Sequence, residues 1–187
     1  MKSLLYSFLL LGFFTFSQCK KKSTNPIDEL PPETQTGANT FGCLVDGEAF
    51  KPGGASLSGG SLQCNYQYLG NQVGGGYFFV VKGTNQSDAG VFSVSLFIDS
   101  LQIFQGNKLT LRSRINGNAS ASYFKSPTNP YYEIYKTGST NFLGEIWVKK
   151  FDTLNQIVSG TFWFDAVNNS GQKVEIREGR FDMRYTR

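Results

Sequence analysis

Few side chains in this sequence could carry chemistry, because histidine is absent from all 187 residues. This absence removes Ser-His-Asp and Cys-His catalytic arrangements, zinc sites built on imidazole, and the commonest general base. The carboxylates that remain as candidates are Glu133, Glu145, Asp152 and Asp165. A pair of carboxylates can hydrolyse a glycosidic bond, but nothing in the spacing of these four fixes their separation. We therefore expect no enzymatic activity and no cofactor.

Two other patterns suggest ligand sites and are better interpreted as turns. The segment "DAVNNSG", residues 165–171, carries oxygen-bearing side chains of the kind that bind calcium, but it lacks the ligand spacing of a calcium loop. The stretches "GGASLSGG" and "VGGGY" lack the glycine spacing of phosphate-binding loops. We expect turns at all three places, and no metal site.

Cys19 stands between an apolar run and three lysines, in "FSQCKKK". The run from Leu4 to Phe16 is shorter than the roughly 18 residues that suggest a membrane-spanning helix, and it has the pattern of an export signal. A cysteine at this position resembles the lipobox of bacterial lipoproteins, in which the thiol is acylated and the chain is cut just before it. Ser17 fits that motif, whereas Gln18 replaces its usual small residue. The resemblance implies that Cys19 is a lipidation site.

Cys43 and Cys64 are then the two remaining cysteines. In an oxidising compartment they can form a disulfide. The loop closed by that bond would correspond to about 3 kcal/mol of stabilisation on the chain-entropy account. The alternative is two buried free thiols that pack as small hydrophobic side chains. The sequence leaves both open, because it does not show whether the two Cα atoms approach within about 7 Å.

From Phe41 onward the sequence has an all-β pattern. Short aromatic and β-branched runs alternate with clusters of Gly, Asn, Ser and Asp. In "VFSVSLFI", residues 91–98, large apolar residues alternate as in a strand with one buried face. Asp46-Gly47 predicts a hairpin turn, "NNSG" predicts a second turn, and Gly179 predicts a bulge. We predict about nine or ten strands in an antiparallel β-sandwich or β-barrel, and the sequence does not decide between them.

Composition divides the chain into three regions. We predict a lipoprotein signal peptide at residues 1–18, a lipidated N-terminus with a flexible linker at 19–40, and a single all-β domain at 41–187. The formal net charge is +4, and three of the lysines directly follow Cys19. Because nucleic-acid-binding proteins concentrate Lys and Arg on one face, we expect no nucleic-acid partner. The lysine cluster suits anionic lipid headgroups beside an anchor.

Aromatic residues make up 15% of the chain, and they are its main candidates for ligand contact. Exposed Tyr and Trp side chains can stack on sugars or anchor a peptide. The candidates are Tyr131, Tyr132, Tyr135 and Trp147. Tyr66 and Tyr68 also share a strand face. The competing and favoured explanation is that these aromatic side chains fill a β core.

Two segments carry a family resemblance. The first is "LPPETQTGANTFGCLVDGEAFKP", and the second is "SGTFWFDAVNNSGQKVEIREGRFD", with its Gly-Thr-Phe and Gly-Arg-Phe-Asp elements. Both resemble the opening and closing segments of a family of small Bacteroidota lipoproteins whose domain has no known function. The resemblance implies an envelope location and an all-β fold, and it implies no activity.

The sequence therefore predicts a lipid-anchored cell-envelope protein with a non-enzymatic binding or structural domain. The alternatives are a β-barrel carrier of a small hydrophobic ligand, and a surface module that binds glycans; a peptide ligand is also open. Lys20 stands where an Asp would retain an enterobacterial lipoprotein at the inner membrane, so we expect the outer membrane. Bacteroidota surface-export signals tend to place acidic residues after the cysteine. Lysines stand there instead, so we expect the protein to face the periplasm rather than the cell surface.

Overall fold

A computed structural model describes residues 25–54, 60–70, 74–128, 130–138 and 141–187. The predicted signal peptide and Cys19 lie outside these residues. The described chain forms one short 3-10 helix and eleven strands, which confirms the all-β prediction. The elements are η1 (Pro26–Glu29), β1 (Thr40–Val45), β2 (Glu48–Phe50), β3 (Leu62–Tyr68), β4 (Tyr77–Ser87), β5 (Gly90–Ile98), β6 (Lys108–Leu111), β7 (Ala119–Thr128), β8 (Tyr131–Lys136), β9 (Gly144–Asp152), β10 (Ile157–Val167) and β11 (Lys173–Arg184).

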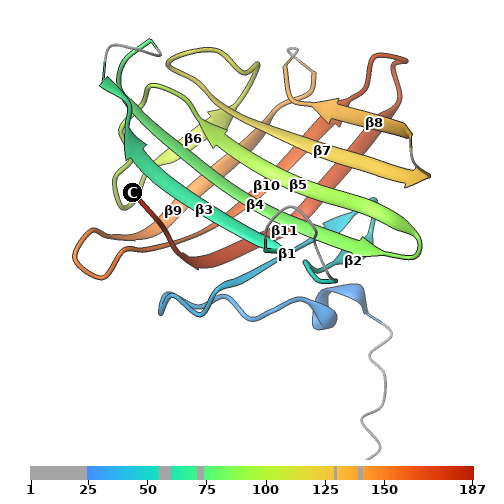
Figure 1. Cartoon of the computed structure of the whole chain (residues 1–187), viewed down its shortest axis with the longest axis horizontal. Coiled ribbons are helices and arrows are strands. Elements are labelled where there is room, and N and C mark those ends of the chain that lie inside the picture. Colours follow the sequence, from blue (N-terminus) through green and yellow to red (C-terminus); the bar gives the residue numbers. More distant parts are fainter. Residues whose placement is uncertain (1–24, 55–59, 71–73, 129, 139–140) are drawn as a thin grey trace, which may run out of the picture.

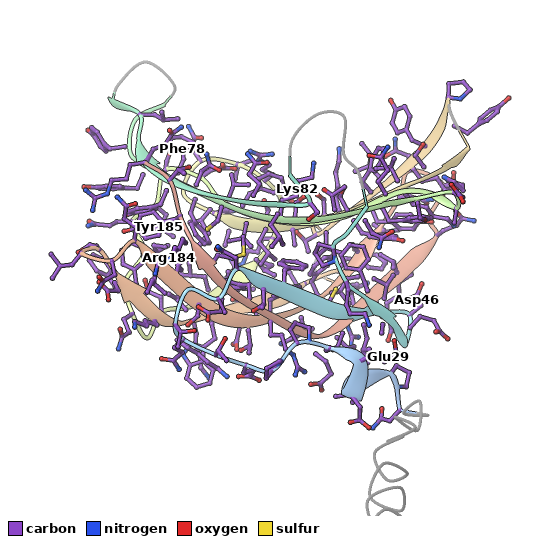
Figure 2. The ribbon with its side chains drawn as sticks, turned by 60° about the horizontal axis from the view of Figure 1, so that its bottom comes forward. Glu29, Asp46, Phe78, Lys82, Arg184 and Tyr185 are labelled. Carbon is purple, nitrogen blue, oxygen red and sulfur yellow. The ribbon has the colours of Figure 1, made fainter. Side chains whose placement is uncertain are left out.

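The strands form one mostly antiparallel sheet that folds over into two layers (Figures 1 and 2). Their order is β2-β1-β11-β10-β9-β6-β7-β5-β4-β3, and β8 pairs with both β7 and β10. In Figure 1 the strands β3, β4 and β5 cross β9, β10 and β11 at a steep angle. This is the geometry of orthogonal sheet packing. The arrangement confirms the all-β and mostly antiparallel parts of the prediction.

Isolated bridges join the two ends of this strand order. Asn65 of β3 bridges Thr186, which follows β11, and Gly53, which follows β2, bridges Asn85 of β4. These are single bridges, so the two ends meet at seams instead of forming a continuous ladder. One of the seams forms the groove described below.

Large apolar side chains fill the space between the layers (Figure 2). In β5, Val94, Leu96 and Ile98 have no solvent exposure, as the alternation in 91–98 predicts. They belong to the same core cluster as Phe164 of β10 and Ile176 of β11. Complete burial of one such side chain contributes about 1.5–3 kcal/mol. The core thus holds the two layers together.

The Asp46-Gly47 turn, the "NNSG" turn and the bulge are confirmed, whereas the predicted turns in "GGASLSGG" and "VGGGY" lie partly outside the described residues. Asp46 and Gly47 both have positive φ, 50° and 88°, as a type I′ hairpin turn requires. The Asn168 side chain accepts the backbone N–H groups of Ser170 and Gln172 at 3.0 and 2.9 Å. The pairing of β10 with β11 shifts register between Phe162 and Phe164, next to Gly179. Turn chemistry and glycine placement were therefore readable in the sequence.

The N-terminal segment differs from our expectation. We expected a flexible linker at residues 19–40, but residues 25–39 pack against the domain, and the side chain of Leu30 is buried. The carboxylate of Asp182 on β11 accepts hydrogen bonds from the backbone N–H groups of Thr36, Gly37 and Ala38. It also accepts the Thr34 hydroxyl at 2.6 Å. We name this set of contacts the Asp182 clasp.

Cys43 and Cys64 are free, and the disulfide alternative is therefore wrong. Cys43 lies on β1 and pairs with Phe50, whereas Cys64 lies on β3 and pairs with Val81. Both side chains are part of the core cluster, where they pack as small hydrophobic groups. Burial raises the pKa of both thiols far above the ordinary value, which makes them poor nucleophiles.

Candidate ligand groove

The structure does not gather the four predicted ligand-contact aromatics in one place. Tyr131 and Tyr132 are exposed on β8, and Trp147 is 37% exposed on β9. Tyr135 is buried, and its hydroxyl donates to Glu133 at 2.6 Å. The core interpretation therefore holds for Tyr135, while the other three side chains reach solvent.

Tyr131 and Trp147 lie far apart on the sheet. Trp147 pairs with Thr161 on β10, while β8 meets β10 only where Lys136 pairs with Val167. At about 3.3 Å per residue, Thr161 and Val167 are separated by about 20 Å along β10, and Tyr131 is at the other end of β8. These aromatics therefore form no common ligand surface.

Three of the four candidate carboxylates are engaged in structural contacts. Glu133 accepts the Tyr135 hydroxyl, and Asp152 accepts two backbone N–H groups in the turn after β9. Asp165 forms ion pairs with Arg177 and Lys173. Burial tends to raise the pKa of Asp165, but these two cations outweigh it, so the pKa is lowered. Each of these three carboxylates thus has a structural partner.

A groove of about 540 Å³ opens at the seam where β3 meets the chain after β11. Figure 2 shows Tyr185, a residue of this seam, at one end of the two layers. Five of the residues that line the groove are aromatic. The lining is Tyr66, Gln67, Tyr68, Tyr77, Gln102, Phe151, Thr153, Tyr185 and Arg187.

Backbone hydrogen bonds across the seam assemble this lining. The N–H of Tyr66 donates to the carbonyl of Thr186 at 2.8 Å, and the N–H of Thr186 donates back to Cys64 at 3.0 Å. These bonds place Tyr185 beside Tyr66. The guanidinium of Arg187 donates to the carbonyl of Thr153 at 2.8 Å, which holds it at the rim.

The rings of the groove form two stacked pairs that meet at right angles. Tyr66 stacks on Tyr77 with centroids 5.2 Å apart, and Phe151 stacks on Tyr185 with centroids 5.6 Å apart. The ring of Tyr66 meets those of Phe151 and Tyr185 edge-on, at 5.0 and 5.8 Å. Because each ring is fixed by its neighbours, the groove is preorganised for a ligand.

The lining residues of the groove include two buried tyrosines whose hydroxyls donate no hydrogen bond to a described residue. These are Tyr66 and Tyr185, which are 7% and 2% exposed. A buried donor left without an acceptor costs about 1–3 kcal/mol. Burial raises the pKa of Tyr66 to about 12, and the nearby backbone of Ile103 opposes this. Tyr66 therefore stays a neutral hydrogen-bond donor at physiological pH.

The rim is polar and carries a single cation among the lining residues. Leu101 donates its N–H to the carbonyl of Tyr77 at 3.0 Å, which holds the neighbouring Gln102 over the groove. Tyr68, 62% exposed, forms a wall. Arg187 is the charged group of the lining, and no carboxylate side chain lines the groove with it. The geometry suits an apolar or planar body with a polar or anionic group at one end.

The described ranges contain neither a metal-binding cluster nor a membrane-spanning helix. Those residues contain no group of three or more His, Cys, Asp or Glu side chains placed to hold a metal ion. In the same residues no helix combines the length and apolarity needed to cross a bilayer.

Comparison with known families identifies the domain. Residues 73–183 match the family described as Domain of unknown function (DUF6252). The chain belongs to this family. No curated protein and no solved structure matches it. The DUF6252 match includes Tyr77 and Phe151 of the groove, while Tyr66, Tyr68 and Tyr185 lie outside it.

Part of the groove could be predicted from the sequence. Tyr66 and Tyr68 were noticed as a shared strand face, because two aromatics at i and i+2 are visible in a single strand. Tyr77, Phe151 and Tyr185 come from three other places in the chain, and only the seam brings them together. Phe181, Met183 and Tyr185 alternate in the sequence, and all three are buried. This alternation indicates a buried strand face but does not reveal which residues lie beside it.

Proposed function

We propose that this DUF6252 protein is a lipid-anchored, non-enzymatic cell-envelope protein that binds a small amphipathic ligand in the aromatic groove. The ligand would have an apolar or planar body and an anionic group. The observation that carries the proposal is the juxtaposition of five aromatic side chains with one cation around a volume of about 540 Å³. That volume is in the range of about 300–1,000 Å³ for small-molecule sites.

The ligand class follows from the charge and the hydroxyl groups of the groove. Arg187 can pair with a carboxylate or sulfonate at the rim. The rings of Tyr68 and Phe151 offer apolar contact, and the hydroxyls of Tyr66 and Tyr185 offer donors to a polar atom of the ligand. This differs from the barrel carrier of our earlier alternative, because the groove lies at an end of the two layers and the core is filled.

Lipid anchoring is supported by the position of Cys19 after the apolar run. Acylation contributes about 0.8 kcal/mol for each buried CH₂, so several acyl chains hold a protein firmly to a bilayer. We propose the outer membrane with the domain toward the periplasm, since Lys20–Lys22 follow the cysteine. We expect Cys19→Ala to abolish labelling by a radioactive fatty acid and release the protein from the membrane fraction. Unchanged fractionation together with an unlabelled parent protein would reject the anchor.

The groove is tested with 8-anilinonaphthalene-1-sulfonate, a planar apolar probe with one negative charge. We expect saturable binding, with displacement by laurate and weaker displacement by dodecanol. Tyr68→Ala and Arg187→Gln should each weaken binding by about tenfold, equivalent to about 1.4 kcal/mol. The matched controls are Tyr131→Ala, an exposed tyrosine on β8, and Arg112→Gln, an exposed arginine outside the groove.

Equal loss in the groove variants and their controls would reject the groove as the binding site. Equal displacement by laurate and dodecanol would reject the role of Arg187. Thermal unfolding of each variant separates loss of binding from loss of fold.

A further inference from the structure

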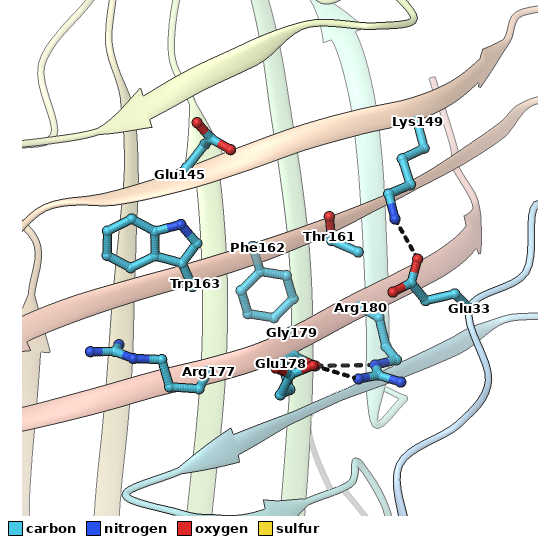
Figure 3. A pocket seen from close by; sticks show the side chains of 10 residues that line it. All are labelled: Glu33, Glu145, Lys149, Thr161, Phe162, Trp163, Arg177, Glu178, Gly179 and Arg180. Carbon is cyan, nitrogen blue, oxygen red and sulfur yellow. Dashed lines mark hydrogen bonds and ion pairs between the residues drawn. The ribbon is translucent and has the colours of Figure 1, made fainter. Parts of the chain in front are cut away.

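A second hollow, of about 410 Å³, lies on the outer face of β9, β10 and β11 (Figure 3). It shares no lining residue with the aromatic groove. The lining is Glu33, Glu145, Lys149, Thr161, Phe162, Trp163, Arg177, Glu178, Gly179 and Arg180. We name it the Trp163 hollow.

Strand register places its polar groups around one indole ring. Trp163 of β10 pairs directly with Glu145 of β9. On the other side the guanidinium carbon of Arg177 lies 5.6 Å from the centroid of the indole ring. In Figure 3 the ring of Trp163 is seen face-on between these two side chains. With 44% of its surface exposed, Trp163 offers an accessible aromatic face on a central strand.

A bulge in β11 shapes the wall of the hollow. Glu178 has a φ of +53°, in the left-handed region that costs a non-glycine residue about 1–3 kcal/mol. A Cβ on Gly179 would stand 2.5 Å from the ring of Phe162, so only glycine lets the two strands approach. Arg180 holds the strained residue, since it donates to the carbonyl and the carboxylate of Glu178 at 3.1 and 3.2 Å. Bulges of this kind re-aim side chains and are common beside functional sites.

The N-terminal segment supplies a further wall. Glu33 forms an ion pair with Lys149 of β9, and both side chains line the hollow. Figure 3 shows this pair at the side of the hollow opposite Trp163. Because the Asp182 clasp fixes the segment that begins at Thr34, the hollow is complete only when that segment is docked.

Charge in the hollow is balanced. Three carboxylates, Glu33, Glu145 and Glu178, face three cations, Lys149, Arg177 and Arg180. Glu145 alone among the three carboxylates has no hydrogen bond or ion pair with a described residue. A site for a polyanion or a polycation would carry an excess of one sign. A neutral ligand rich in hydroxyl groups can use the donors and the free acceptor together.

We propose that the Trp163 hollow is a saccharide-binding site for a neutral oligosaccharide. Trp163 packs against the face of one sugar ring, and Glu145 accepts hydrogen bonds from its hydroxyls. Arg177 donates to the sugar through Nε, because its two terminal nitrogens already donate to Asp165, Glu175 and two backbone carbonyls. The exposed indole supplies apolar contact at low entropic cost, and the open outer face admits a stretch of a longer chain. This inference goes beyond the proposed function and does not depend on the aromatic groove.

The test uses the full chain in detergent with a panel of neutral hexasaccharides: maltohexaose, cellohexaose, xylohexaose, mannohexaose and chitohexaose. Hyaluronan hexasaccharide is the polyanionic comparison. Binding is followed by tryptophan fluorescence and by isothermal titration calorimetry. We expect at least one neutral hexasaccharide to bind. Trp163→Ala and Glu145→Gln should each weaken it by about tenfold or more.

Tyr131→Ala is the control, because Tyr131 is an exposed aromatic residue on β8, far from the hollow. It should change the dissociation constant by less than about twofold. Tyr68→Ala should leave saccharide binding unchanged, which separates this site from the groove. Glu145→Gln preserves shape, so it keeps the test valid if Trp163→Ala fails to fold. Absence of binding by every neutral hexasaccharide, binding of hyaluronan alone, or equal losses in the Trp163 and Tyr131 variants would overturn the proposal.

Discussion

The carboxylate of Asp182 accepts the backbone N–H of Gly37 at 2.8 Å, across 145 residues of sequence. Asp182 is 1% exposed, and the same carboxylate also accepts donors from Thr34, Thr36 and Ala38. The contact joins the N-terminal segment to β11. Glu33, the residue before Thr34, lines the Trp163 hollow. The buried carboxylate of Asp182 therefore supports both the fold and a candidate site.

We expect Asp182→Asn to destabilise the domain by about 2–4 kcal/mol, because hydrogen bonds to a charged acceptor are worth about 1.5–3 kcal/mol each and are not additive. The amide would also turn a donor toward the N–H groups of the clasp. Urea denaturation measures the loss, and proteolysis should then cut within residues 30–39. Asp88→Asn is the control, since that carboxylate is exposed and has no described partner. Equal stability of the Asp182 and Asp88 variants would contradict the clasp.

The clasp also predicts how stability depends on pH. Burial tends to raise the pKa of Asp182, but the hydrogen bonds from Thr34, Thr36, Ala38 and Gly37 outweigh it and lower the pKa. An unfolded aspartate titrates near 3.9, so the folded carboxylate binds its proton less readily. The stabilisation is therefore complete above about pH 5 and is lost as the pH falls below about 4. Unfolding free energies measured between pH 7 and pH 3 should fall less steeply in Asp182→Asn than in the parent chain. Parallel curves would exclude this role.

Because Cys43 and Cys64 are buried free thiols, their reactivity should differ between the folded and the unfolded chain. In a Cys19→Ser chain, Ellman's reagent should find no reactive thiol in the folded protein and two after unfolding without reductant. Reductant should leave the midpoint of thermal unfolding unchanged. Detection of fewer than two thiols in the unreduced, unfolded chain would restore the disulfide.

The bulge in β11 predicts that alanine destabilises the domain at Gly179 but not at Gly53. Gly179→Ala should destabilise the domain by about 1–3 kcal/mol, because the new Cβ would overlap the ring and the carbonyl of Phe162. The Gly53→Ala control should be nearly neutral, since no atom lies within 4 Å of a Cβ built there. Thermal and urea denaturation of the two variants provide the comparison. Similar losses in both would show that crowding at Phe162 is not the cause.

Local signals predicted most of the fold. The alternation in residues 91–98, the Asp46-Gly47 turn and the bulge at Gly179 are properties of a few neighbouring residues, and all three appear in the structure. The docking of residues 25–39 could not be predicted in this way. That segment lacks apolar periodicity, and its acceptor is one aspartate far along the chain.

For the candidate sites, too, local features could be predicted from the sequence, whereas contacts between distant residues could not. Trp147 and Tyr131 were selected by residue type, yet their strands place them far apart. Trp163 lies in an alternating stretch of the sequence, but its position beside Glu145 depends on strand register and its position beside Arg177 depends on the bulge. Residue type therefore identified what could bind, while register decided which residues meet.

The docking of residues 25–33, which precede the Asp182 clasp, limits how far the domain can stand from a bilayer. With the lipid that we propose on Cys19, Asn25 lies six residues after the anchor, and its side chain accepts the N–H of Ile27 at the start of η1. Six extended residues span at most about 20 Å, whereas a free linker reaching residue 40 would span more than three times that distance. The short tether would hold the face that carries η1 toward the headgroups, so ligands would approach the domain from its sides and its far end.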